Sequence, residues 1–487
     1  MKRNRILEIL PGFISWNLIL FLIWGGYFFP IFTAYFILAF DVFWVWKGFS
    51  LTLAAVISHL RIKASERLDW MKEVRGFGDW TKVRHIILLL IANEPWETYK
   101  RTLEALTKQT FPLNQIAVVL ATEERFSEGK KGAEMLKRSI GKKFGACLIT
   151  VHPSDIAGEV KGKSANEAWA AKKAKQELID NLGWNIDFAT ITSNDADAIL
   201  HPQYFAYLTF KFLDDPQRYE RFWQPAIVFY NNIWRIPALT RVINVFSNVW
   251  QIGLLMRKDR LISFSNYTAS LKMVDEIGYW DTDVIPEDYR IFFKAFFKLG
   301  GRVEVEPIFL PSSADAAQST STWRTLINEY EQKKRWAWGV SDLPLFIEMY
   351  FKQPKVSFIN KTLRIARVAT DHLLWPVNWF IITVGVSIVT LVNPLFRRTA
   401  LGFSLPRISS GILTITLIYL VILLYIEFRH RPSRPHDVPK WRAWLTPFEF
   451  ILMPISGFFF NALPGLDAHT RLMLGKYIEY RVTEKVK

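Results

Sequence analysis

Two long apolar stretches open the chain, and they set the strongest limit on its fold. They cover residues 11–29 and 30–57. A helix of about 20 residues crosses the hydrocarbon core of a bilayer, so each stretch is long enough to span it. The first stretch has no small-residue cleavage pattern and the second follows it at once, which predicts two retained spans and not a removable signal. Asp41 interrupts the second stretch, and we expect its carboxyl group to face protein.

Composition limits the rest of the chain to a mixed protein. Half of the 487 residues are apolar and 20 are tryptophan, a residue that membrane interfaces favour. The net charge of +16 is compatible with nucleic acid, anionic lipid or an anionic substrate as partner. Basic residues gather beside apolar segments, as in residues 1–5 and 429–442, which favours the membrane surface over nucleic acid. Cys147 is the only cysteine, so an internal disulfide is excluded.

Charge next to the apolar stretches predicts which way the chain crosses. Arg61, Lys63 and Arg67 follow the second stretch, and basic residues also precede the first, so both ends of this pair should be cytoplasmic. Apolar spans return near residues 372–392 and 412–426. A last apolar segment, 448–463, has basic residues on both sides, and we expect it to be re-entrant or interfacial.

Between the apolar regions, strand-length apolar runs alternate with helical patterns. We expect strands at 86–91, 116–121 and 188–192, with helices at 97–108 and 164–182. This order predicts an α/β domain with a mostly parallel sheet. The predicted organisation is two transmembrane helices (1–60), an amphipathic linker (61–80), a cytoplasmic domain (81–345), and a C-terminal region (346–487) with interfacial helices and about two further transmembrane helices.

Ligands of parallel sheets bind beyond the carboxyl ends of the strands. Asp195 and Asp197 follow the strand at 188–192, and residues two apart in an extended chain point to the same side. Such a pair could hold a hard cation through its oxygens, although on this motif alone a solvated or capping pair is the default interpretation. Glu287 and Asp288 precede an amphipathic run at 291–299. They fit either the start of a helix or, for Asp288, a general base.

A third motif is helical and basic. Gln332 and Arg335 share a face of the helix, and Trp336 follows them. Arg335 could bind a diphosphate bidentately, and Trp336 could offer a flat face to a sugar ring. The alternative is the basic end of a surface helix.

The order of these pieces resembles the membrane-integrated family 2 glycosyltransferases, which include cellulose, chitin and hyaluronan synthases. Their D-x-D, E-D and Q-x-x-R-W motifs occur here in the same order over residues 86–339. The resemblance implies a nucleotide-sugar-binding α/β fold of the GT-A type, flanked by transmembrane and interfacial helices. It implies Mg²⁺ or Mn²⁺ on Asp195 and Asp197, and a catalytic set made of Asp288, Glu287, Gln332, Arg335 and Trp336.

The same resemblance implies a set of donor-binding residues: Asn93, Glu94, Glu123, Lys163, Asn166, Asp195, Thr483 and Lys485. Thr483 and Lys485 belong to a tail that resembles the F-x-V-T-x-K gating loop of cellulose synthases. Three places depart from the family pattern. The proline usually found before Asn93 is missing, Asn166 comes one place early, and Glu123 stands where an aspartate is usual.

The sequence therefore predicts an inverting glycosyltransferase in the cell (inner or plasma) membrane, multi-pass, with its catalytic domain in the cytoplasm. It would move a sugar from a nucleotide-sugar, with UDP as the expected nucleotide, to a glycan or lipid acceptor, by single transfer or by processive polymer synthesis. The bilayer is an expected partner, nucleic acid is not, and an oligomer or accessory subunit would be compatible with the sequence. The rival interpretation is a non-catalytic scaffold subunit that binds nucleotide-sugar in a polysaccharide synthesis complex.

Overall fold

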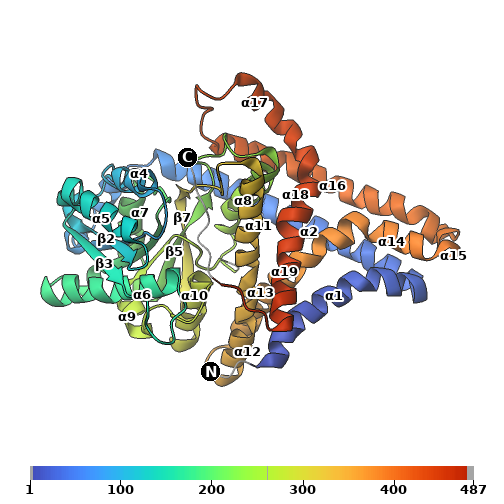
Figure 1. The fold of residues 1–487 in the computed structure, drawn as a ribbon, viewed down its shortest axis with the longest axis horizontal. Coiled ribbons are helices and arrows are strands. Elements are labelled where there is room, and N and C mark those ends of the chain that lie inside the picture. Colours follow the sequence, from blue (N-terminus) through green and yellow to red (C-terminus); the bar gives the residue numbers. More distant parts are fainter. Residues whose placement is uncertain (1–3, 260, 480–487) are drawn as a thin grey trace.

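The fold was obtained as a computed structural model that describes residues 4–259 and 261–479. Figure 1 shows three parts in a row: a sheet covered by helices, a middle group of helices, and a projecting bundle of long helices. The sheet part corresponds to the predicted α/β domain, and the bundle contains the predicted N-terminal spans.

Seven strands form one sheet in the order β3-β2-β1-β4-β6-β5-β7. Pairing is parallel throughout, except that β6 runs antiparallel to both of its neighbours, β4 and β5. The predicted mostly parallel α/β sheet is therefore confirmed. The strands are β1 (Arg84–Leu90), β2 (Ile116–Glu123), β3 (Ala146–His152), β4 (Ala189–Asp195), β5 (Arg221–Val228), β6 (Tyr267–Ser270) and β7 (Glu304–Ser313).

Helices cover both faces of the sheet, which explains why its strands are apolar without alternation. In β1, Ile87 and Leu89 belong to the core of one face, while Ile86 and Leu88 belong to the core of the other. The first face is covered by α4 (Trp96–Leu106), α5 (Ser127–Ser139) and α7 (Tyr204–Asp214). The second is covered by α6 (Lys163–Ala174), α9 (Leu271–Ile277) and α10 (Glu287–Lys298).

A middle group of helices joins the sheet to the bundle, and in Figure 1 its members run across the direction of the bundle. The group comprises α8 (Ala238–Leu254), α11 (Thr322–Ala337), α12 (Leu343–Lys352), α13 (Phe358–Trp379), α17 (Lys440–Leu445), α18 (Met453–Gly457) and α19 (Leu463–Leu474). Shorter 3-10 and π-helical turns complete the elements: η1 (Trp80–Lys82), η2 (Leu113–Gln115), η3 (Gly141–Lys143), η4 (Lys175–Asn181), η5 (Ile186–Phe188), η6 (Arg218–Glu220), η7 (Trp338–Asp342), η8 (Phe380–Val384), η9 (Thr446–Leu452) and η10 (Phe458–Ala462).

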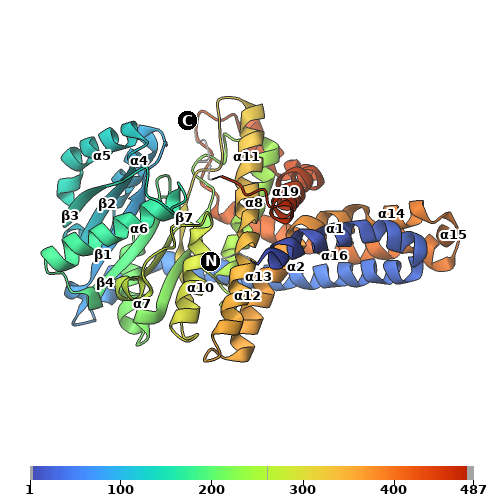
Figure 2. The ribbon, with the colours of Figure 1, turned by 60° about the horizontal axis from the view of Figure 1, so that its bottom comes forward.

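The bundle consists of two helical hairpins that extend together away from the sheet (Figure 2). The first hairpin is α1 (Arg5–Phe28) with α2 (Pro30–Arg67), and Pro30 suits the first turn of α2 because its ring presets φ. The second is α14 (Gly385–Val392) and α16 (Ala400–His430), joined through the short α15 (Pro394–Arg397). At the far tips the Asn393 side chain donates a hydrogen bond to the carbonyl of Tyr27 (3.1 Å).

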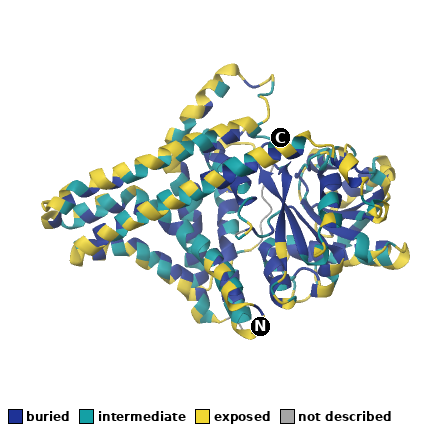
Figure 3. Cartoon of the chain, turned by 180° about the vertical axis from the view of Figure 1, so that it is seen from behind, coloured by how far each residue is buried: buried dark blue, intermediate teal, exposed yellow. Residues whose placement is uncertain are grey.

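Five helical segments of the described chain are long and apolar enough to cross a membrane. They are Arg5–Phe28, Pro30–Arg67, Phe358–Val392, Ala400–His430 and Lys440–Leu474. Figure 3 shows that the projecting bundle is largely exposed or half-buried, whereas the sheet is buried. Apolar helices exposed in this way match a lipid environment.

The predicted linker at 61–80 differs in detail from the structure. Helix α2 continues through Arg67 with no break at residue 61, and the chain turns only at Leu68 and Asp69. The Asp69 side chain then accepts hydrogen bonds from the amides of Met71 and Lys72 and caps α3 (Trp70–Val74). Asp69, the N-cap residue of α3, therefore marks the boundary between α2 and α3.

The last apolar segment is divided into short pieces. Residues 448–463 run from η9 through α18 and η10 to the first residue of α19, and Figure 1 shows α18 and α19 crossing the direction of the bundle. By length and composition the whole segment Lys440–Leu474 could also cross a membrane. That residues 448–463 form a re-entrant or interfacial segment therefore stays a prediction.

Asp41 is fully buried between α2 and α16, where its Oδ2 accepts a hydrogen bond from Ser409 Oγ (2.6 Å). The expectation that this carboxyl group faces protein is confirmed. A polar contact of this kind favours one register of the two hairpins, because any slip would leave the carboxyl group facing lipid.

The bundle predicts a topology that labelling can check. In a Cys147→Ser background, Arg398→Cys at the exposed tip beside α15 should react in intact cells with a membrane-impermeant maleimide. Met135→Cys on α5, where Met135 is 53% exposed, should react only after permeabilisation. Reaction of Met135→Cys in intact cells would contradict the predicted cytoplasmic side of the sheet domain.

Candidate active site

The candidate functional residues gather at the carboxyl edge of the parallel strands. Helices α6 and α10 begin at this edge, with Lys163 and Glu287 as their first residues. Because β6 is antiparallel, the loop before its first residue, Tyr267, also lies at this edge, next to the end of β4 at Asp195. One edge therefore collects residues that are more than 120 positions apart in the sequence.

Lys163 is the centre of the cluster. Its Nζ lies 3.0 Å from Asp195 Oδ1 and 2.9 Å from Glu287 Oε1, and it donates a hydrogen bond to the carbonyl of Ser265 (3.1 Å). The Lys163 side chain is only 10% exposed and that of Glu287 is 6% exposed. The pair with Glu287 is thus shielded from water, which strengthens its attraction, whereas Asp195 is 31% exposed.

The charges of this cluster are interdependent. Burial alone would lower the pKa of Lys163, but Asp195, Glu287, Glu167 and Asp288 together raise it well above its usual value, so the ammonium group stays charged. Burial raises the pKa of Glu167 well above its ordinary value and also raises that of Glu287, while Lys163 opposes both shifts. One cation faces several carboxyl groups here, which favours proton sharing among them over full ionisation.

Ser265 connects Asp195 of the D-x-D motif to Asp288 of the E-D motif. Its backbone amide donates to Asp288 Oδ2 (2.9 Å), and its hydroxyl donates to Asp195 Oδ2 (2.5 Å). Ser265 has a φ of 47°, a left-handed conformation that a residue other than glycine adopts seldom. Beside it, Asn266 Oδ1 accepts a hydrogen bond from the amide of Asp195 (2.8 Å).

Ser265 and Asn266 were not among the predicted site residues. The contacts of these two residues depend on the antiparallel placement of β6, which no local pattern reveals. Glu167 was also missed. It lies one helical turn after Lys163, is fully buried, and has no hydrogen-bond partner recorded for either oxygen among the described residues.

Glu287 and Asp288 occupy the first turn of α10, as the helix-start interpretation expects, and the general-base role of Asp288 stays a prediction. Asp288 Oδ1 accepts a hydrogen bond from the amide of Tyr289 (2.9 Å), which orients the carboxylate at the helix terminus. The Tyr289 hydroxyl in turn donates to the carbonyl of Gly339, three residues after Trp336. The E-D and Q-x-x-R-W motifs are therefore joined through Tyr289.

Asp197 has different neighbours from Asp195. Strand β4 ends at Asp195 and the chain turns there, so the extended-chain expectation that both carboxylates point to the same side does not hold. Asp197 is buried. Its Oδ2 accepts a hydrogen bond from the backbone amide of Asp315 (2.8 Å), and its backbone carbonyl accepts one from the side-chain amide of Asn231 (3.0 Å). These contacts tie Asp197 to the ends of β7 and β5.

The residues present fit a hard cation bound jointly with a ligand. No group of three metal-ligating side chains occurs within residues 4–259 and 261–479. Mg²⁺ is commonly held by one or two carboxylates together with phosphate oxygens and water. Asp195 at the carboxyl edge suits such a site, whereas Asp197 Oδ2 is directed to the amide of Asp315, so the role of Asp197 as a metal ligand stays a prediction. Lys163 already forms an ion pair with Asp195, so a cation bound to this carboxylate would have to share it with Lys163.

The predicted donor-binding residues of β1 and β2 lie along the same edge. Asn93 is exposed in the loop after β1, and Glu94 Oε2 accepts a hydrogen bond from the backbone amide of Ala92 (2.7 Å). Glu123 at the end of β2 forms an ion pair with Arg125 (2.6 Å). Asn166 on α6 donates to the carbonyl of Ala121 (3.1 Å), which fixes the helix against β2.

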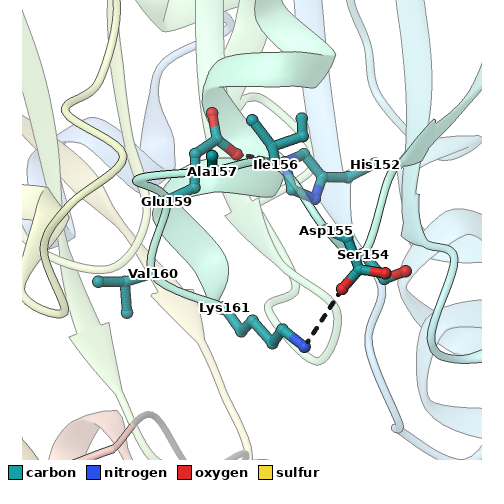
Figure 4. Close-up of a pocket in the computed structure, with 8 residues that line it drawn as sticks. All are labelled: His152, Ser154, Asp155, Ile156, Ala157, Glu159, Val160 and Lys161. Atoms are coloured by element: carbon teal, nitrogen blue, oxygen red, sulfur yellow. Dashed lines mark hydrogen bonds and ion pairs between the residues drawn. The ribbon is translucent and has the colours of Figure 1, made fainter.

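A pocket of about 250 Å³ lies beside these residues, in the loop from β3 to α6 (Figure 4). Its lining includes His152, whose Nε2 lies 2.8 Å from Glu159 Oε2, and Lys161, whose Nζ lies 3.7 Å from Asp155. Lys163 follows this loop directly, so the pocket adjoins the charged cluster.

Gln332, Arg335 and Trp336 lie in the last two turns of α11. Gln332 is 5% exposed, and Trp336 stacks on Phe229 after β5, with ring centroids 5.8 Å apart. Lys333 Nζ lies 3.9 Å from the Trp336 ring centre. The diphosphate role of Arg335 stays a prediction.

Thr483 and Lys485, predicted from the gating-loop resemblance, lie outside the described residues.

Comparison with known proteins found several solved structures at low sequence identity and one family model. Among solved structures, a mannosyltransferase (PcManGT) from Pyrobaculum calidifontis in complex with GDP-Man and Mn²⁺ is 13% identical, with a TM-score of 0.42, covering 80% of this chain and 99% of the other. TarS from S. aureus in complex with UDP-GlcNAc is 12% identical, with a TM-score of 0.35, covering 82% and 93%. GalNAc-T7 with UDP, GalNAc and Mn²⁺ is 14% identical, with a TM-score of 0.36, covering 60% and 59%.

No curated protein matches the chain. A family model described as glycosyl transferase family group 2 matches residues 190–427, just under half of the sequence. The matched stretch contains Asp195, Asp197, Asp288 and Arg335, and it continues through most of α16. Over this stretch, from β4 in the sheet to α16 in the bundle, the chain is similar to the family 2 glycosyltransferases.

Proposed function

We propose that this chain is a membrane-bound, metal-dependent inverting glycosyltransferase that moves a hexose from a nucleotide-sugar, UDP-linked as first choice, to an acceptor hydroxyl. The observation that carries the proposal is the bridge through Ser265, which holds Asp195 and Asp288 on either side of one loop. The family match to residues 190–427 supports it, since that stretch contains both acids. Five apolar helical segments support the membrane location.

The proposed reaction is a single displacement. The acceptor oxygen attacks the anomeric carbon, the bond from that carbon to the diphosphate oxygen breaks, and the proton of the acceptor hydroxyl passes to Asp288. The nucleoside diphosphate leaves. Asp288 suits the base role because the amides of Ser265 and Tyr289 fix both of its oxygens. A cation held by Asp195 and Asp197 would neutralise charge that develops on the leaving diphosphate.

Lys163 and the α11 motif would complete the donor site. Lys163 stays charged and lies at the start of α6, where free amides also attract an anion, so it is placed to contact the diphosphate. Arg335 would add a bidentate contact, and Trp336 would orient the acceptor sugar. Holding both substrates in this way supplies much of the barrier reduction in a displacement of this type.

Replacing the proposed base separates chemistry from binding. Asp288→Asn should lower turnover about 10²- to 10⁴-fold, the usual contribution of a general base, and should leave donor binding within about threefold of the parent. Nucleoside diphosphate release by the purified full chain measures the first quantity, and titration with a fluorescent nucleotide-sugar measures the second.

A matched control for that variant is Asp283→Asn, which changes a neighbouring carboxyl group that is 61% exposed. It should retain activity. If Asp288→Asn turns over as fast as this control, Asp288 is not the base. If the parent releases no nucleoside diphosphate from any UDP-, GDP- or dTDP-sugar, the scaffold interpretation replaces the enzyme.

Metal dependence gives a second test. Chelation by EDTA should abolish nucleoside diphosphate release, and Mn²⁺ or Mg²⁺ should restore it, because two carboxylates and the diphosphate would share the cation. Asp197→Asn should weaken Mn²⁺ binding in the presence of donor by about tenfold or more, as read from the free Mn²⁺ signal in electron paramagnetic resonance. Asp187→Asn, at the opposite end of β4 and paired with Lys272, is the control that should bind Mn²⁺ normally.

A further inference from the structure

We infer that the acceptor is a membrane-anchored amphiphile, a lipid or a lipid-linked glycan, whose free hydroxyl enters the site from the bilayer. The inference rests on the proposed function and narrows it, since a growing polymer passed through the bundle is the alternative. Four observations carry it: the filled interior of the bundle, two side-chain connections from the site to the bundle base, and the charge of the site.

The interior of the bundle is filled by side chains. Leu22 of α1, Ile37 of α2, Val389 of α14 and Leu405 of α16 are all fully buried in one apolar cluster. The helices approach closely, since a Cβ added at Gly26 would lie 3.2 Å from the Cα of Val389. Within the described helices a sugar chain therefore has no path along the bundle axis, because close-packed interiors leave no room for it.

The first connection runs from Asp288 to α2. Tyr289 follows Asp288 and lies beside His372 of α13, with ring centroids 6.2 Å apart. The preceding residue of α13, Asp371, forms an ion pair with Lys47 of α2 (3.2 Å). Lys47 is 17 residues beyond Pro30, or roughly 26 Å along the helix, close to the roughly 30 Å thickness of a hydrocarbon core. Lys47 thus marks the membrane boundary nearest the sheet.

The second connection runs from Ser265 to α2. Phe264 precedes Ser265 and packs against Trp250 of α8, with ring centroids 5.8 Å apart. One turn on, Gly253 of α8 lies against Leu51 of α2. Trp250 is 40% exposed at this place, and an indole ring suits the boundary between lipid and water. An acceptor whose tail stays in the bilayer could therefore pass Trp250 and reach the Ser265 loop.

The charge of the site selects a hydroxyl as the attacking group. Asp195, Glu287 and Asp288 surround Lys163, and the metal ion proposed above would serve the donor diphosphate and not the attacking group. An anionic nucleophile such as a lipid phosphate would meet these carboxylates with repulsion, whereas a neutral hydroxyl would not. The acceptor class is therefore a lipid alcohol or the sugar hydroxyl of a lipid-linked glycan.

The test uses the full chain in nanodiscs of phosphatidylethanolamine and phosphatidylglycerol, with the donor found by nucleoside diphosphate release. Octadecyl, dodecyl and octyl β-glucosides and β-galactosides are compared with cello- and chito-oligosaccharides. Transfer to the octadecyl glycosides should exceed transfer to the octyl ones about tenfold or more, because longer chains partition more strongly into the bilayer. Mass spectrometry should show one or a few added sugars.

Two tryptophan variants test whether the acceptor passes the α8 face. Trp250→Ala should lower transfer to octadecyl glycosides about tenfold relative to Trp323→Ala, which removes a tryptophan that is 71% exposed elsewhere, on α11. Equal loss in both variants would overturn the role of the α8 face. Oligosaccharides used as well as octadecyl glycosides, or long chains built on any acceptor, would overturn the inference while leaving the transferase intact. Absence of even acceptor-independent donor hydrolysis would instead remove the proposed function itself.

Discussion

The ion pairs of Lys163 hold the candidate site together. Its ammonium group joins Asp195 at the end of β4 to Glu287 at the start of α10, and Lys163 and Glu287 are both buried, whereas Asp195 is partly exposed. Removing one partner from such a pair would leave a buried charge without compensation, typically at a cost of about 3–5 kcal/mol. The positions of the Ser265 loop, and through it of the Asp288 carboxylate, depend on this contact.

The sequence was sufficient for much of the fold, since its signals were long and periodic. Uninterrupted apolar runs became β1 and β2, buried on both faces, and two apolar stretches became the hairpin of α1 and α2. Element ends were harder, as α2 shows by continuing to Arg67 until Asp69 caps the next helix. The antiparallel β6 also escaped prediction, because strand direction depends on tertiary pairing.

The sequence predicted those residues of the candidate site that belong to recognisable motifs. It did not predict those whose roles depend on tertiary packing. Lys163, Asp195, Glu287 and Asp288 were all singled out from the sequence, and the structure brings them into one cluster. Asp197 was expected beside Asp195, yet the turn after β4 directs it toward the end of β7. Ser265, Asn266 and Glu167 were missed because their roles arise from contacts between distant segments, which a single sequence does not display.

The filled interior of the bundle has a consequence for the energetics of the membrane. A protein that conducts a hydrated chain must prevent protons and ions from leaking beside it, and this usually requires a gate or a plug. Side chains of the described helices occupy the space where such a water column would form, and the Asp41–Ser409 contact seals one of the helix interfaces. An apolar cluster of this kind offers no row of polar side chains along which water or ions would cross, so the packed bundle would not by itself dissipate an ion gradient across a membrane.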